Sequence, residues 1–110
     1  MEIHVGTKVS FDLREYEYDE DDFPDGIDAD YTVKALNGRF AICTKPCPEH
    51  DTVWYSIIDF DEGIRGQNNY VFNIYDYSKQ EDIEQCLADL QSGKTEISRR
   101  RRVNLSTFEG

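Results

Sequence analysis

The sequence predicts an α+β fold, in which an antiparallel sheet of about five strands carries one main helix. Apolar and polar residues alternate in several short runs, which is typical of half-buried strands. Short turn segments separate these runs, so we expect neighbouring strands to pair as a meander. Residues 78–92 instead place apolar residues at helical spacing. A chain of 110 residues has the length of one domain, and we expect residues 1–110 to form a single domain.

The expected strands are short and rich in β-branched and aromatic residues. Within the region 31–46, the pair Asn37-Gly38 predicts a hairpin turn. The segment that contains the last arginines returns to β-like composition after the helix. The expected strand regions are 1–13, 31–46, 52–60, 68–77 and 95–108.

The helix over 78–92 has recognisable start and stop signals. Ser78 and Glu81 form the S-x-x-E pattern of a capping box. Gly93 is the expected residue that follows the helix end. One apolar stripe should face the sheet, and its members are Ile83, Cys86, Leu87 and Leu90.

An acidic loop is predicted over residues 15–30. This stretch, EYEYDEDDFPDGIDAD, holds nine acidic residues and no basic one. Its Pro-Asp-Gly sequence indicates a turn. We expect an exposed loop held by three aromatic anchors, Tyr16, Tyr18 and Phe23.

The overall charge and composition limit the possible partners. The net charge is -11, so the protein should not bind nucleic acid directly, because the phosphate backbone would be repelled. No apolar run approaches the length of a membrane span, and the N-terminal residues do not resemble a signal peptide. Three cysteines fit reduced thiols better than a disulfide framework. We therefore expect a cytoplasmic protein without a membrane partner.

Four consecutive arginines near the C-terminus are the first candidate for a binding site. They are Arg99, Arg100, Arg101 and Arg102. Alternate residues of a strand face opposite sides, so two arginines should point each way. Guanidinium groups suit phosphate oxygens, and a local cluster can hold a small anion inside an acidic protein. The alternative is that they neutralise the acidic loop or contact a partner subunit.

The segment 59–72 is the second candidate. Two glycines flank Arg65, and Asn68, Asn69 and a ring, Phe72 or Tyr70, follow. Glycines let backbone N–H groups approach an anion, asparagines donate and accept hydrogen bonds, and rings stack on bases. This inventory suits a small nucleotide, whereas the alternative is an ordinary hairpin turn. That this segment lies beside the arginine run is a hypothesis, which the sequence alone does not show.

Metal binding and catalysis are not expected. Cys43, Cys47 and His50 have a spacing outside the usual zinc patterns. The carboxylates of Asp59, Asp61 and Glu62 are expected to be solvated, and no arrangement of nucleophile and base is recognisable. The sequence therefore indicates a protein that is not an enzyme and that needs no cofactor.

Residues 39–105 resemble small proteins of phages and prophages. The resemblance is carried by YSIIDFDEGIRGQNN (55–69), by the capped helix and by EISRR (96–100). Within that group the chain is similar to the Thoeris anti-defence sponge family. That similarity implies a non-enzymatic homo-oligomer that sequesters a small cyclic nucleotide signal, either of cyclic ADP-ribose type or a cyclic oligonucleotide. It implies phosphate contacts from Arg65 and the arginine run, and base stacking by Phe72 or Tyr70.

Two other functions remain open at this point. Anti-CRISPR proteins and other small phage inhibitors are often equally acidic. The acidic loop could imitate a nucleic-acid backbone and dock on a CRISPR or restriction protein of the host. The third function is a plain interaction protein without a ligand.

Overall fold

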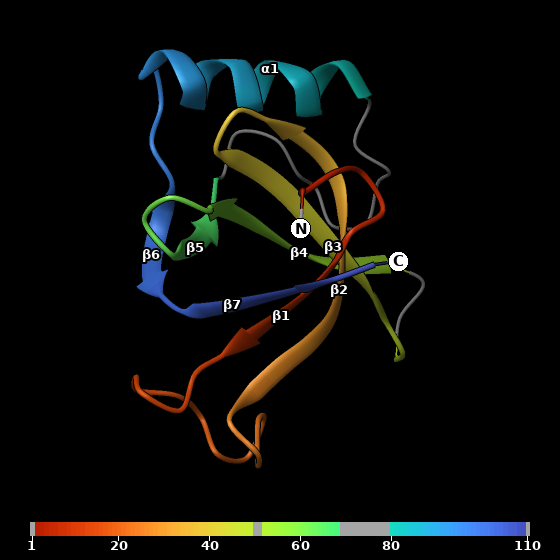
Figure 1. Ribbon diagram of the computed structural model, residues 1–110, viewed down its shortest axis with the longest axis vertical. Helices are drawn as coiled ribbons and strands as arrows, with labels where there is room; N and C mark the ends of the chain where they lie inside the picture. The colour runs from red at the N-terminus through yellow and green to blue at the C-terminus, as the bar shows by residue number, and fades with distance from the viewer. Residues whose placement is uncertain (1, 50–51, 69–79, 110) are drawn as a thin grey trace.

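The computed structural model describes residues 2–49, 52–68 and 80–109. Within these residues, seven strands form one sheet in which every pairing is antiparallel. One helix, α1 (Gln80–Ser92), follows the fifth strand (Figure 1). The strands are β1 (Lys8–Asp12), β2 (Ile27–Asn37), β3 (Phe40–Cys47), β4 (Thr52–Asp59), β5 (Ile64–Gln67), β6 (Ser98–Arg102) and β7 (Asn104–Phe108).

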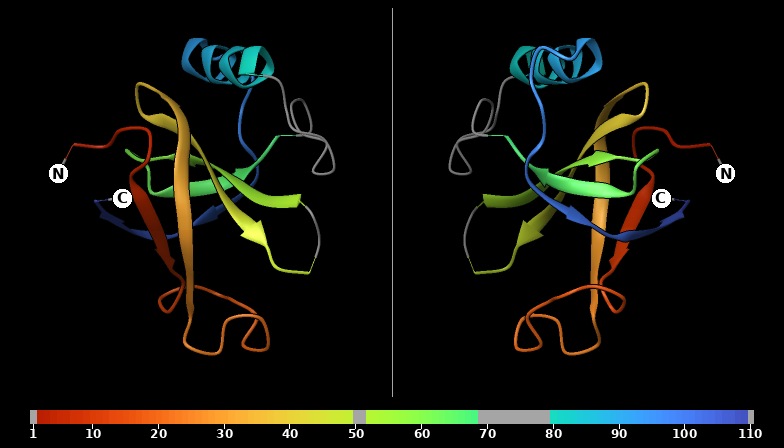
Figure 2. Two further views of the ribbon diagram at one scale, coloured as in Figure 1. Left: turned by 90° about the vertical axis from the view of Figure 1, so that its right-hand side faces the viewer. Right: turned by 90° about the vertical axis from the view of Figure 1, so that its left-hand side faces the viewer.

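The first five strands form the expected meander, and the last two strands complete the sheet at both of its ends. The strand order is β6-β5-β4-β3-β2-β1-β7. Strands β6 and β7 are separated only by Val103, whose N–H donates to the carbonyl of Gly63 at 2.9 Å. The sheet must curl for one continuous segment to border both β5 and β1. Figure 2 shows β6 running directly into β7 across this curl.

The two faces of the sheet support two apolar clusters. Alternate residues of β3 separate between them: Phe40 and Ile42 face α1, whereas Ala41 and Cys43 face the inside of the curl. The helix-side cluster is Ala35, Phe40, Ile42, Ile57, Ile83, Cys86, Leu87, Leu90 and Ile97. The inner cluster is Val9, Phe11, Leu13, Tyr31, Val33, Ala41, Cys43, Ile58 and Val103.

The helix matches its predicted pattern where the structure describes it. All four residues of the expected stripe are buried. At the C-terminus, Gly93 has φ +80 and its N–H donates to the carbonyl of Leu90 at 3.2 Å. The N–H of Lys94 donates to the carbonyl of Asp89 at 2.8 Å, which completes a Schellman motif. The proposed cap, Ser78, lies outside the described residues. The helix has only 13 residues, and no helix in the described ranges could span a membrane.

The expected number of strands was too low, for identifiable reasons. Residues 64–67, read as part of a turn, form β5, a strand of four residues that contains a glycine. The acidic loop ends earlier than predicted, because β2 begins at Ile27 and includes two aspartates, which strands disfavour. The segment 95–108 forms two strands. Residues 69–77 of the strand expected over 68–77 lie outside the described residues.

The predicted hairpin exists, but its turn is shifted by one residue. Asn37 pairs with Phe40, so the two-residue loop is Gly38 and Arg39. Gly38 has φ +61, a conformation that glycine adopts without strain. The loop therefore begins with glycine instead of ending with it.

Gly66 permits the close approach of β6 to β5. A Cβ added at this residue would lie 2.3 Å from the carbonyl oxygen of Ser98 and 2.4 Å from Cγ2 of Ile97. The first of these contacts is with backbone, which cannot rotate away. A side chain at this position would therefore separate the two strands.

We predict that Gly66→Ala lowers the free energy of unfolding by about 2 kcal/mol, because the added methyl group overpacks the contact between β5 and β6. Chemical denaturation followed by circular dichroism would measure this change. Gly93→Ala is the control: nothing lies within 4 Å of its added Cβ, so only backbone strain of about 1 kcal/mol is expected. A Gly66→Ala variant as stable as the wild type would contradict the close approach.

Candidate functional site

A charge cluster lies inside the curl of the sheet, and it consists of Asp28 on β2, Lys45 on β3 and Arg65 on β5. The Asp28 carboxylate is only 4% exposed. Its Oδ2 accepts from Nη1 of Arg65 at 2.7 Å, and its Oδ1 accepts from Nζ of Lys45. Two cations share one carboxylate, so the cluster carries a net positive charge in a region of low dielectric.

Aromatic rings of the inner cluster pack against both cations. The guanidinium carbon of Arg65 lies 4.5 Å from the ring centroid of Phe11, and Nζ of Lys45 lies 4.9 Å from that of Tyr31. These distances are in the range of cation–π contacts. Burial and, to a smaller extent, the nearby Asp28 carboxylate raise the pKa of Tyr31 to about 12. Tyr31 is therefore a neutral phenol at physiological pH.

Arg101 lies directly opposite Arg65 in the pairing of β5 with β6. Like charges at directly opposite positions of antiparallel strands are destabilising. Asp28 offsets the charge of Arg65. Among the described residues, however, no carboxylate forms an ion pair with Arg99, Arg100, Arg101 or Arg102. This pairing places residues 64–67 of the segment 59–72 beside the arginine run, as hypothesised from the sequence.

The arginine run does not divide evenly between the two faces, as simple alternation predicted. Arg99 has φ +52, and the register advances two residues on β5 while it advances three on β6, which marks a bulge. Arg99, Arg101 and Arg102 line hollows next to the acidic loop. Arg100 instead lines a separate cavity of about 190 Å³ on the helix side, near Leu90. Simple alternation would place Arg102 with Arg100, so Arg102 is the residue that departs from the prediction; it lies at the end of β6, where its Nη1 donates to the carbonyl of Glu62 at 3.3 Å.

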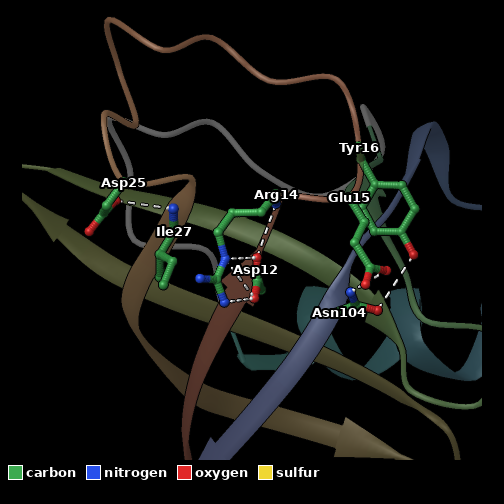
Figure 3. Close-up of polar contacts among 7 residues, drawn as sticks. All are labelled: Asp12, Arg14, Glu15, Tyr16, Asp25, Ile27 and Asn104. Carbon is green, nitrogen blue, oxygen red and sulfur yellow. Dashed lines mark hydrogen bonds and ion pairs between the residues drawn. The ribbon is translucent and has the colours of Figure 1, made fainter.

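The acidic loop, residues 15–26, is held at its base and by its rings. Asn104 on β7 donates to Glu15 at 3.0 Å and accepts from the hydroxyl of Tyr16 at 3.5 Å. Asp25 accepts from the N–H of Ile27 at 3.1 Å (Figure 3). Two of the three expected anchors, Tyr18 and Phe23, pack against the inner cluster. The loop lies at the opposite end of the molecule from α1 (Figures 1 and 2).

A cleft lies between the acidic loop and β6, and we call it the arginine cleft. It has a large lobe of about 700 Å³ and a small lobe of about 350 Å³. Phe23, Arg65 and Arg101 line both lobes, so the lobes adjoin at these residues. The large lobe is further lined by Leu13, Tyr16, Glu17, Tyr18, Asp19 and Arg102. The small lobe is further lined by Asp22, Asp28, Tyr31, Trp54, Tyr55, Ser56, Gly66, Gln67 and Arg99.

The predicted site residues have different positions relative to this cleft. Arg65, Arg99, Arg101 and Arg102 line it, whereas Arg100 does not. Asn68 is buried and donates to Oγ1 of Thr95 at 3.2 Å, so it holds β5 against the segment before β6. Asn69 and Phe72 lie outside the described residues.

Several cleft residues were not singled out from the sequence. Trp54 is 56% exposed and lines the small lobe, although the sequence indicated only that its strand is aromatic. Its alternation with Ser56 and Ile58 would have placed it on the inner face. The role of Asp28 was hidden because it belonged to a stretch read as a solvated loop.

Two groups outside the cleft, the thiol of Cys43 and the carboxylate of Asp59, are buried. Cys43 is buried in the inner cluster, and burial raises its pKa to about 12. In the described part of the chain, no three histidine, cysteine, aspartate or glutamate side chains gather closely enough to hold a metal ion. His50 lies outside that part. Asp59, expected to be solvated, is 4% exposed and pairs with Arg39 at 3.1 Å.

Comparisons with known proteins give no relative for this chain. No family model matches it, and no curated protein or solved structure is significantly similar.

The base of the acidic loop contains a fixed ion pair between Arg14 and Asp12 (Figure 3). Nη2 of Arg14 lies 2.6 Å from Oδ2 of Asp12, and the backbone N–H of Arg14 donates to Oδ1 at 3.0 Å. These hydrogen bonds lower the pKa of Asp12 from 3.8 to about 2. Because this pKa is depressed in the folded protein, the stabilising contribution is complete above the ordinary value and is lost as the pH falls through about 2.

We predict that carboxyl-carbon NMR titration gives Asp12 a pKa of about 2 in the wild type. In Arg14→Gln the same carboxyl should titrate close to 3.8, the value without these hydrogen bonds. An Asp12 titration that is the same in both proteins would contradict the ion pair.

Proposed function

We propose that the protein binds a small nucleotide in the arginine cleft and sequesters it without chemical change. In the setting that the sequence resemblance implies, the ligand is a cyclic nucleotide immune signal, and the protein is a phage anti-defence protein in the host cytoplasm. We also propose that it acts as a homo-oligomer. The observation that carries the proposal is the direct cross-strand pair of Arg65 and Arg101 at the centre of a cleft that also contains aromatic rings.

The charges of the cleft support an anionic ligand. Arg14, Arg39 and Arg65 each have a carboxylate partner within 4 Å. Arg99, Arg101 and Arg102 have none among the described residues, yet all three line one cleft. Their mutual repulsion costs stability that a bound phosphate would recover. A guanidinium group is permanently protonated, so it binds phosphate without acting as an acid or a base.

The rings of the cleft support a ligand with a base. Trp54 is the only tryptophan of the chain, more than half of its surface is exposed, and it lines the small lobe together with Arg99 and Tyr55. Phe23 lies where the two lobes meet, next to the central arginines. Stacking of a base on such a ring contributes about 1–3 kcal/mol. Phosphate contacts and stacking together are the two main terms in the binding of a small nucleotide.

A second function is favoured by the acidic loop. The loop is fixed by its backbone bonds and rings, while the carboxylates of residues 19–22 are exposed. A preorganised row of carboxylates could dock on the basic groove of a nucleic-acid-binding defence protein. This inhibitor would depend on residues 19–22 and not on the arginines.

The first function predicts unequal effects of two neighbouring arginine substitutions. Binding of cyclic nucleotides can be followed through the fluorescence of Trp54, which lines the cleft. We predict that Arg101→Ala weakens binding about tenfold or more, because a charge-assisted hydrogen bond is lost. Arg100→Ala, one residue away but on the helix side, should bind as the wild type does.

Two outcomes would contradict this function. Equal losses in Arg101→Ala and Arg100→Ala would show that binding depends on general charge and not on the cleft. Absence of binding across a panel of cyclic nucleotides, combined with no nucleotide released from the purified protein on heating, would exclude a nucleotide sponge.

A further inference from the structure

We infer that two copies of this chain associate edge to edge through β7, as antiparallel strands related by a two-fold axis at Thr107. This inference rests on the homo-oligomer proposed above and specifies its surface, and it does not depend on nucleotide binding. Strands β6 and β7 lie at the two ends of the sheet order (Figure 1). An end strand has unpaired backbone groups along one side, and these groups are a template for a further strand.

The two end strands differ in their protection against such pairing. Strand β6 contains four arginines and a bulge, and two copies of it would place cations opposite each other. Strand β7 has the sequence NLSTF, with no charged residue and no proline. Its five pairs with β1 are consecutive, so it has no bulge there. Charge, proline and bulges are the usual means of blocking an edge, and β7 has none of them.

The open side of β7 follows from the crossing point at Val103. The N–H of Val103 donates to the carbonyl of Gly63, and so it points away from β1. Backbone groups of alternate residues in an extended segment point to the same side. Leu105 and Thr107 therefore direct their N–H and C=O groups away from β1. Among the residues that the structure describes, β7 forms a ladder with β1 alone.

The alternation along β1 leads to the same assignment. The carbonyl of Thr7 accepts from the N–H of Val33 on β2 at 2.9 Å. The next residue, Lys8, therefore faces β7, where it pairs with Phe108. Phe108 thus bonds to β1, and Thr107 faces the open side.

The open side of β7 is complementary to itself. When Thr107 of one copy lies opposite Thr107 of the other, Leu105 of each copy lies opposite Glu109 of its partner. These three residues direct their backbone groups to the open side, so they form the hydrogen-bonded pairs of an antiparallel ladder. No charged residue lies opposite a like charge. The interface uses the same surface of both copies, so the association closes at two chains.

Exposed apolar side chains lie at this edge. Phe108 is 51% exposed and Val5 is 61% exposed. The ion pair of His4 with Glu109, at 3.6 Å, brings the segment that contains Val5 to the end of β7. In the proposed register, Phe108 of each copy is a diagonal neighbour of Phe108 of the other, a separation that aromatic side chains can bridge. Pairing of the edges therefore also buries apolar surface.

The charges at this edge suit a second copy more than a basic partner. The chain carries a net charge of -11, so most surfaces of two copies repel each other. At the end of β7, however, Lys8 lies opposite Phe108, next to Glu109. Both signs of charge are thus present there, and two acidic chains can approach with little repulsion.

The test measures the mass of the protein by analytical ultracentrifugation. The wild type should change from one chain to two chains as its concentration rises. Thr107→Pro removes an N–H from the open side and leaves the bonds to β1 intact. Phe108→Glu removes the diagonal ring contact and places a carboxylate opposite Lys8 of its own sheet. Each substitution should raise the dissociation constant of the dimer about tenfold or more, because symmetry removes each interaction twice.

The control is Trp54→Glu, which removes an exposed ring far from β7 in the sheet order and should leave the dissociation constant unchanged. Thermal unfolding verifies that each variant is folded, and Phe108→Glu decides the test if Thr107→Pro does not fold. A dimer that Phe108→Glu does not weaken would overturn the β7 surface while the homo-oligomer stands. A wild type of one chain at every concentration would overturn both. Neither result bears on nucleotide binding, which the arginine substitutions test separately.

Discussion

The structure depends on the C-terminal segment 98–108, which pairs with both ends of the sheet. Strand β6 completes one end beside β5, and β7 completes the other beside β1. Val103 lies between them in the inner cluster, and its bond to Gly63 fixes the point where the segment crosses. Because β1 leads directly into the acidic loop, this closure brings the arginines to one side of a cleft and the carboxylates to the other. The cleft is therefore a consequence of the topology.

The second property of the cleft is the arrangement of its charges. The pairing of Arg65 with Arg101 places two cations together, and Asp28 offsets only one of them while it also holds Lys45. A buried carboxylate that satisfies two cations fixes the position of Arg65 more firmly than a surface pair would. Arg101 remains exposed in the cleft. The acidic protein thus contains a localised cluster of cations, and screening by salt limits the range of its field to about 10 Å.

The sequence predicted the parts of the structure that depend on local patterns. The helix stripe follows from periodicity and the glycine stop from local sequence, and both are confirmed. Nothing local indicates that β7 pairs with β1, since their contact joins residues about 100 positions apart. The bulge at Arg99 and the ion pairs of Asp28 also depend on distant strands. The division of the arginine side chains between the two faces was therefore not predicted correctly.

The central claim is that three arginines of β6 act together at one cleft while the fourth faces away. Side-chain NMR of the arginine Nε–Hε groups, with and without cyclic diadenylate, tests this claim most directly. The account predicts that the signals of Arg99, Arg101 and Arg102 shift together and saturate at one ligand per cleft, while Arg100 stays unchanged. The claim is contradicted if the signals of all four arginines shift only in proportion to the ionic strength, or if only the signal of Arg100 shifts.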